Sequence, residues 1–225
     1  MGVEIKEPII NKDSLEANFT NEGGVNKTFR FLKNIMGLWL LQSVRRIWMK
    51  EGVELSYSEI TNLAEETEPF QYFVNPDDDS FLNPPNMESA IKEFCKKTPQ
   101  KVPKTKGEII RCILESLAFR YKEVFETLEK LLGKHIRILH IVGGGSQNTL
   151  LSQFTADALD IPVITGPVEA TAMGNIMIQA ISRGAIKDLP HGRKIIKNSF
   201  EPVVYYPRDH ERWEKEYKRY KEITS

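Results

Sequence analysis

The sequence has few cysteines, no excess of either charge and no long apolar run, and each absence excludes a class of protein. Its 225 residues include two cysteines, Cys95 and Cys112, which are too few for a disulfide scaffold and have no metal-ligand spacing around them. We interpret them as two partly buried thiols. Lys plus Arg and Asp plus Glu both number 31, so no global basic field favours nucleic acid as a partner.

No segment approaches the ~20 apolar residues of a membrane span, and the first 19 residues lack the apolar run of a signal peptide. We therefore expect a soluble, cytoplasmic protein without a membrane partner. The length fits one large domain or two small ones, either of which can bury a sizeable core.

The first part of the chain is predicted to be helical. Apolar residues recur at helical spacing from Phe29 to Met49, which predicts one long helix. Shorter helices are predicted from Ser56 or Ser58 to a stop before Pro69, and from about Met87 to Lys97. The stretch EIIRCILESLAFRYKEVFETLEKLLG predicts the longest helix, facing the core and ending at Gly133.

A loop separates two of these helices, because FVNPDDDSFLNPPNM contains Asn-Pro, an Asp triplet and Pro-Pro. Asp77, Asp78 and Asp79 suggest a calcium loop, but the ligand alternation and the glycine of an EF-hand are missing. Solvated surface or loop capping is the favoured interpretation of the three carboxylates.

The second part of the chain alternates between strand and helix. IRILHIV predicts a strand, NTLLSQFTADAL a helix, IPVITG a second strand, and VEATAMGNIMIQAISRG a second helix that ends at Gly184. This order predicts a βαβ crossover in a largely parallel sheet. We expect the tail from residue 209 to 225 to form a polar, exposed helix.

Gly143, Gly144 and Gly145 join the first of these strands to its helix. A glycine turn there exposes backbone N–H groups and lets a nucleotide approach closely. The Rossmann pattern fails, because Asn148 occupies the third glycine position and no acid ends the next strand. GGVNKT at residues 23–28 fails as a P-loop, because Asn26 replaces the glycine before Lys27. A turn used only for packing remains an open alternative.

Three stretches carry a resemblance to a known family: residues 140–176, TNEGGVNKTFRFLKNIMGLWLLQ and NPDDDSFLNPP. From about Met1 to Lys187 the chain resembles the carboxyl-terminal half of the FGGY carbohydrate kinases, in particular those that act on L-rhamnulose. The resemblance implies an α/β fold of the ribonuclease-H-like, actin-like ATPase type, a mixed sheet with flanking helices that lacks its first strand. We expect residues 1–190 to form the nucleotide-binding domain and residues 191–225 an extension with a polar helix.

The resemblance also implies roles for four residues. Gln42, Gly144 and Asn148 match ATP contacts of the family and Asn34 a substrate contact, whereas no catalytic or metal-binding residue is matched. If Asn34 and Gln42 share one helix, they lie ~12 Å apart along its axis and ~80° apart around it, so one helix can reach both sugar and nucleotide. From the residues alone, the alternative is that each amide satisfies a neighbouring backbone group.

The chemistry implied by the resemblance is transfer of the γ-phosphoryl group of MgATP to the 1-hydroxyl of L-rhamnulose, giving L-rhamnulose 1-phosphate. Such a transfer requires positioning, a metal ion and a carboxylate that accepts the hydroxyl proton. In the family this aspartate belongs to the amino-terminal kinase domain, so we expect this chain to be a fragment that is inactive alone. A non-catalytic remnant that serves as a binding or assembly module is the alternative. The resemblance further implies that Cys95 and Cys112 lie within disulfide reach, without a bond that folding requires.

Overall fold

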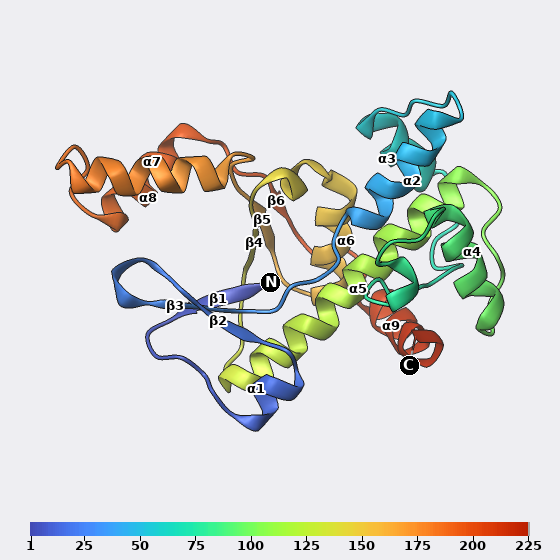
Figure 1. Ribbon diagram of the computed structural model, residues 1–225, viewed down its shortest axis with the longest axis horizontal. Helices are drawn as coiled ribbons and strands as arrows, with labels where there is room; N and C mark the ends of the chain where they lie inside the picture. The colour runs from blue at the N-terminus through green and yellow to red at the C-terminus, as the bar shows by residue number, and fades with distance from the viewer. Residues whose placement is uncertain (225) are drawn as a thin grey trace.

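The computed structural model describes residues 1–224, and the chain begins with a small antiparallel sheet (Figure 1). Its strands are β1 (Gly2–Ile5), β2 (Thr20–Gly23) and β3 (Phe29–Leu32), in the order β1-β3-β2. The short helix α1 (Lys12–Glu16) lies between the first two strands. Phe31 of β3 is fully buried and stacks on Phe19, with ring centroids 5.0 Å apart. This aromatic pair anchors the sheet against the end of the long helix α5 (Lys106–Leu132).

The single helix predicted from Phe29 to Met49 is wrong in its first half. Residues Phe29–Leu32 form β3, and the helix α2 starts later and spans Trp39–Lys50. In β3 the side chains of Phe29 and Phe31 alternate with Arg30, and pairing with both β1 and β2 makes the strand the centre of its sheet. Asn34 therefore lies in the loop between β3 and α2, and the common-helix geometry with Gln42 is also wrong.

The fragment GGVNKT lies in the turn between β2 and β3. The N–H of Gly24 donates to the carbonyl of Thr28 at 2.7 Å and closes this turn, which contains the 3₁₀ turn η1 (Val25–Lys27). Asn26 has a left-handed φ of 57°. Because a strand and no helix follows, the segment has no phosphate-binding helix N-terminus, in agreement with the failed P-loop match.

The other helices of the first part are confirmed: α3 (Tyr57–Glu65), α4 (Met87–Lys97) and α5. The side chain of Ser56 caps α3 and that of Thr105 caps α5, each in a reciprocal bond pair with a glutamate three residues later. Gly133 ends α5 with φ +62°, as the stop signal predicted. The Asp-rich segment is irregular, apart from the 3₁₀ turn η2 (Asp79–Phe81).

The predicted βαβ unit is also present. Strands β4 (Leu139–Ile141) and β5 (Val163–Thr165) pair in parallel, joined by helix α6 (Thr149–Leu159). Strand β6 (Val204–Tyr205) pairs antiparallel with β5, so the sheet is mixed, in the order β4-β5-β6. Helices α7 (Ala170–Ser182) and α8 (Leu189–Ser199) leave this sheet as an arm at the upper left of Figure 1. That this fold lacks a first strand stays a prediction.

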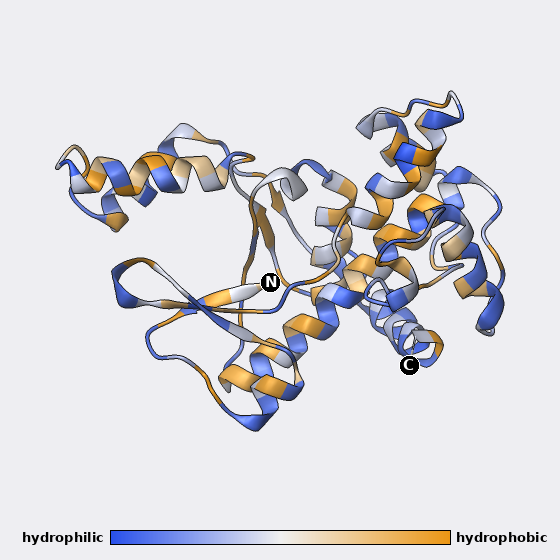
Figure 2. Ribbon diagram, viewed as in Figure 1, coloured by the Kyte–Doolittle hydropathy of each residue, from blue (hydrophilic) through white to orange (hydrophobic). Residues whose placement is uncertain are grey.

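The tail forms helix α9 (His210–Thr224), but the expectation that it is exposed is wrong. Its apolar stripe is buried in the core: Trp213, Tyr217, Tyr220 and Ile223. The first three rings lie 5.1–5.7 Å from the ring of Phe119 on α5. Hydropathy misleads here, since α9 is mostly hydrophilic in colour in Figure 2 although Trp and Tyr rings bury a large area. Ser225, the last residue of the predicted tail, lies outside the described residues.

Two further expectations concern the domain boundary and the cysteines. The boundary predicted at residue 190 falls inside α8, and the division into two units stays a prediction.

Cys95 and Cys112 are both buried and free. A hydrogen bond with the Cys95 thiol, together with burial, raises the pKa of the Cys112 thiol, so the two sulfur atoms are neighbours. Within residues 1–224, no helix is long and apolar enough to cross a membrane.

Candidate functional site

The glycine turn lies at the carboxyl ends of the two parallel strands, where ligands bind in open α/β sheets. After β4, Gly143 adopts φ +79°, and the 3₁₀ turn η3 (Gly144–Gln147) follows. The N–H of Gly143 donates to the carbonyl of Pro167 at 3.0 Å, and that of Gly166 donates to Ile141 at 2.8 Å. The turn is thus held to the ends of both strands.

Gly144 presents bare backbone to its surroundings. A Cβ added there would meet nothing within 4 Å, and the residue does not need a left-handed φ. The N–H groups of Gly144 and Gly145 stand at the start of the 3₁₀ turn, where N–H groups have no partner within the turn itself. This arrangement suits the oxygen atoms of an anionic ligand.

Asn148 follows the turn and is the N-cap of α6. Its side chain is 5 % exposed, and its Oδ1 accepts the N–H of Leu151 at 2.9 Å. In the described part of the chain, its Nδ2 has no hydrogen-bond partner. The capping role of Asn148, which an Asn before an apolar helix signals, therefore leaves one polar group free for a ligand.

Asn34 lies where two cavities meet. The larger, of about 900 Å³, lies between the amino-terminal sheet and the α7–α8 arm, and its lining includes Asn34 and Asn175. The smaller, of about 370 Å³, lies between the loop of residues 34–38 and β4, and its lining includes Asn34 and Gly145. The Asn34 side chain makes no hydrogen bond with any other described residue. The predicted substrate residue and the glycine turn are thus brought to one cavity.

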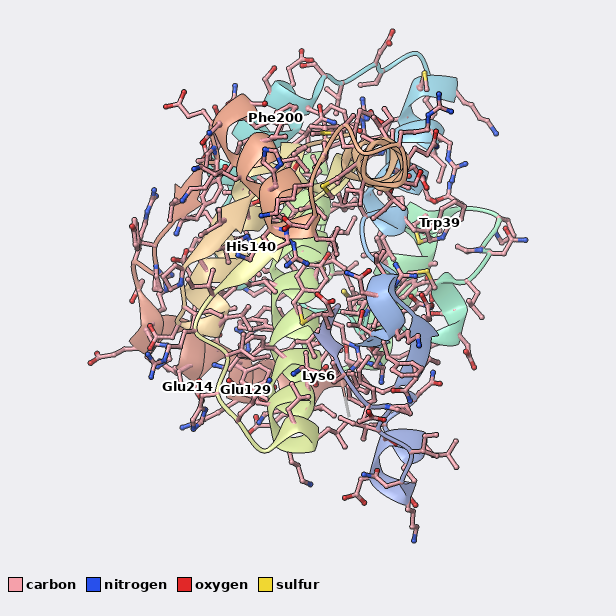
Figure 3. The ribbon with its side chains drawn as sticks, turned by 90° about the vertical axis from the view of Figure 1, so that its left-hand side faces the viewer. Lys6, Trp39, Glu129, His140, Phe200 and Glu214 are labelled. Carbon is pink, nitrogen blue, oxygen red and sulfur yellow. The ribbon has the colours of Figure 1, made fainter. Side chains whose placement is uncertain are left out.

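The smaller cavity has two lining residues that the sequence did not mark as functional. His140 of β4 lies in the middle of the side shown in Figure 3, between Phe200 above and Glu129 below. Tyr121 of α5 was assigned to the core stripe, and burial raises its pKa to about 12. Its phenol is therefore a neutral hydroxyl near pH 7. Helical periodicity marks an inward position, but it does not say that a cavity adjoins it.

Of the four predicted site residues, only Asn34 lines the two cavities. Gly144 and Asn148 do not line either cavity, although Gly145 beside Gly144 lines the smaller one, and Gln42 lines neither. Gln42 is exposed on α2, and its side chain has no hydrogen-bond partner among residues 1–224. Leu38, one turn earlier on the same helix face, does line the smaller cavity. The alternative that the Asn34 and Gln42 amides satisfy neighbouring backbone groups is not observed for either residue.

The aspartates of this chain are engaged elsewhere or exposed. Asp13 is exposed on α1. Burial raises the pKa of Asp157, whose Oδ1 accepts the Gln153 amide at 2.8 Å and the N–H of Arg208 at 2.9 Å. Asp77 forms an ion pair with Arg120. None of the three lines either cavity. Across residues 1–224, no group of three or more His, Cys, Asp or Glu side chains is placed to hold a metal ion.

Comparison with known proteins identifies relatives of this chain. The chain is 48 % identical over 221 residues to the rhamnulokinase of Bacteroides thetaiotaomicron, and 43 % identical over 212 residues to that of Bacillus subtilis. These matches cover 98 % and 94 % of the chain but 45 % and 43 % of the relatives. The chain thus spans less than half the length of the curated relatives it matches.

Solved structures confirm the expected fold class. Xylulose kinase from Rhodospirillum rubrum superposes with a TM-score of 0.67 at 17 % identity, over 98 % of this chain and 43 % of that one. The ADP complex of Plasmodium falciparum glycerol kinase superposes with a TM-score of 0.65 at 14 % identity, over 98 % and 44 %. The family model for the carboxyl-terminal domain of the FGGY carbohydrate kinases matches residues 1–183. The protein therefore belongs to the FGGY family of carbohydrate kinases and contains the carboxyl-terminal domain of that family.

Proposed function

We propose that this chain is the nucleotide-binding half of a kinase that transfers the γ-phosphoryl group of ATP to L-rhamnulose, giving L-rhamnulose 1-phosphate. One observation carries the proposal: Asn34 lines both cavities, and the smaller one ends at the glycine turn. Phosphoryl transfer requires two substrates that meet. A sugar in the larger cavity and a nucleotide at the turn would meet beside Asn34. The sugar is taken from the names of the relatives.

The proposed nucleotide contacts use polar groups that have no hydrogen-bond partner among the described residues. The N–H groups of Gly144 and Gly145 would donate to phosphate oxygen atoms, and the free Nδ2 of Asn148 would donate to the nucleotide beyond them. Gln42 is proposed to reach the nucleotide from α2, since its exposed amide has no hydrogen-bond partner among residues 1–224. Asn34 is proposed to contact the sugar.

The remaining catalytic groups are proposed to come from an amino-terminal kinase domain. The aspartates Asp77 and Asp157 accept hydrogen bonds within this chain, so neither is free to take the proton of a sugar hydroxyl. Mg²⁺ is proposed to arrive bound to ATP, because the residues described here include no carboxylate or histidine cluster for it. Bound there, Mg²⁺ would neutralise phosphate charge. A kinase that consumes ATP is expected in the cytoplasm.

Calorimetry with ADP and ATP tests the nucleotide half of the proposal. We expect saturable binding of one nucleotide per chain, and no binding would contradict the proposal. The sugar half is tested by adding the amino-terminal half of the Bacteroides thetaiotaomicron rhamnulokinase. ADP release that depends on L-rhamnulose and is at least ten times slower with D-xylulose would support it. Nucleotide binding without any sugar-dependent turnover in that mixture would favour the non-catalytic binding module.

A further inference from the structure

Asp77, the first residue of the Asp triplet, joins two segments that line the candidate site. Its Oδ1 accepts the N–H of Met36 at 2.9 Å, and its Oδ2 accepts the Nε–H of Arg120 at 2.8 Å. Met36 belongs to the loop between β3 and α2, and Arg120 lies on α5 next to Tyr121. The carboxylate thus attaches the loop to the longest helix of the fold.

The loop has few hydrogen bonds, although Ile35, Met36 and Leu38 also pack against the hydrophobic clusters. Among the backbone N–H groups of residues 34–38, only that of Met36 donates a hydrogen bond within the described chain, and its acceptor is Asp77. Gly37 has φ +59°, which favours glycine, the residue with the fewest conformational restraints. Yet Asn34, Gly37 and Leu38 all line the smaller cavity. The hydrogen bonding of the loop N–H groups in that cavity wall therefore depends on a single side-chain acceptor 41 residues away.

Both ends of the attachment are firm. Arg120 also donates from Nη1 to Glu123 at 2.8 Å, so two carboxylates orient its guanidinium group. Helix α2 follows the loop, and it is fixed independently because four of its side chains are at most 1 % exposed: Leu40, Leu41, Val44 and Trp48. Loss of the Asp77 carboxylate should therefore free the loop without moving α2 or unfolding the core.

We propose that Asp77 is a positioning residue for the candidate site: it holds the loop of residues 34–38, and with it Asn34, at the wall of the smaller cavity opposite Gly145. The inference rests on the proposed function, in which a nucleotide lies at the glycine turn. It assigns no contact between Asp77 and the nucleotide or the sugar. The effect of Asp77 passes through the Met36 N–H.

The matched pair of variants is Asp77→Ala and Asp78→Ala. Asp78 is the next residue, but its carboxylate accepts the N–H and the hydroxyl of Ser80 and does not contact the loop. We expect Asp77→Ala to weaken ADP binding on the order of 10-fold, because the loop forms the wall of the cavity that adjoins Gly145 of the glycine turn, and small displacements of a site are costly. In the Asp77→Ala variant, the backbone amide of Met36 should lose its protection from hydrogen exchange. Asp78→Ala should change neither quantity.

A third variant separates positioning from charge and guards against misfolding of Asp77→Ala. Asp77→Asn keeps one amide oxygen for the Met36 N–H, but it removes the negative charge and replaces the acceptor for Arg120 with an NH₂ donor. We expect Met36 protection and ADP affinity to change together, both lying between those of the wild type and Asp77→Ala, because the bond to the loop survives while the bond to Arg120 does not. Loss of affinity with Met36 still protected would show that the charge acts by itself, which overturns the proposal.

The failure of the inference is distinguishable from that of the proposed function. If the wild-type chain does not bind ADP, the nucleotide site itself is wrong. If the wild type binds ADP and Asp77→Ala binds it equally well while Met36 is unprotected, the site stands and the positioning role of Asp77 is overturned. Circular dichroism of each variant checks that the fold is retained.

Discussion

Gly143 and Gly144 are neighbours in the chain, but only Gly143 has a left-handed φ, whereas a Cβ on Gly144 would meet open space. The two glycines therefore have different reasons to be glycine. A side chain at Gly143 strains the backbone, because L residues rarely adopt a φ of +79°. A side chain at Gly144 occupies the space that we assign to the nucleotide.

This contrast predicts opposite results for two substitutions. Gly144→Val should weaken ADP binding at least tenfold and leave the melting temperature of the unliganded chain nearly unchanged. Gly143→Val should lower the melting temperature, with a cost on the order of 1–3 kcal/mol. Calorimetry and thermal unfolding measure the two effects. Unchanged ADP affinity in folded Gly144→Val would count decisively against the nucleotide site.

The chain alone is predicted not to phosphorylate L-rhamnulose. Asp77 and Asp157 are held by protein donors and Asp13 is exposed away from both cavities, so none of these aspartates is placed as a general base. General-base assistance is worth typically 10²–10⁴-fold, and positioning of the reactants supplies ~7–11 kcal/mol. A coupled assay for ADP release should detect no turnover that depends on sugar. Sugar-dependent release by the purified chain would place the base within these residues.

The buried carboxyl group of Glu115, which forms an ion pair with Arg111, is predicted to make stability depend on pH. Burial raises the pKa of Glu115 to about 7, from 4.5 in the unfolded chain. Between these two values the folded state binds the additional proton, so the free energy of unfolding falls as pH rises. A difference of about 2.5 pKa units corresponds to about 3 kcal/mol.

Glu115→Gln removes this titration while keeping an oxygen atom for the N–H of Phe70. Urea unfolding at pH 5 and at pH 8 measures the effect. The wild type should lose more stability than Glu115→Gln over this interval, and other titrating groups cancel because both proteins share them. An equal loss in the two proteins would show that Glu115 is already ionised at pH 5.

Helix α9 is predicted to be required for folding, although it lies beyond the residues that match the family model. Trp213 is 4 % exposed and contacts the rings of Phe70, Phe119 and Phe154. Trp213→Ala should lower the free energy of unfolding by about 3–5 kcal/mol. Tyr206, which is 65 % exposed, provides the control, and Tyr206→Ala should change stability by less than about 0.5 kcal/mol. Equal effects would contradict the packing of α9.

Cys95 and Cys112 are predicted to be unreactive in the folded chain. Both are buried, and the raised pKa of Cys112 keeps it as a thiol, whereas the thiolate is the nucleophile. Ellman's reagent should titrate no thiol under native conditions and both thiols in denaturant. A melting temperature that falls on mild reduction would reveal an obligatory disulfide and show this prediction to be wrong.

Local sequence signals were enough for α3 to α6 and for the βαβ order. Ser56 and Thr105 cap helices by bonds within four residues, and Gly133 ends one through its own φ. The glycine turn was equally visible, because three successive glycines between a strand and a helix have a local meaning. Such features depend on neighbours in the chain, so the sequence by itself determined them.

Only the tertiary structure decided the features that depend on distant partners. Phe29–Leu32 carries a helical pattern, yet pairing with β1 and β2 makes it a strand. One face of the polar tail is buried because the rings of α9 meet Phe119, about ninety residues earlier in the chain. Asn34 reaches two cavities, and Asp77 holds Met36 from 41 residues away. Periodicity and propensity describe which face of an element is apolar, but they do not say which surface will cover it.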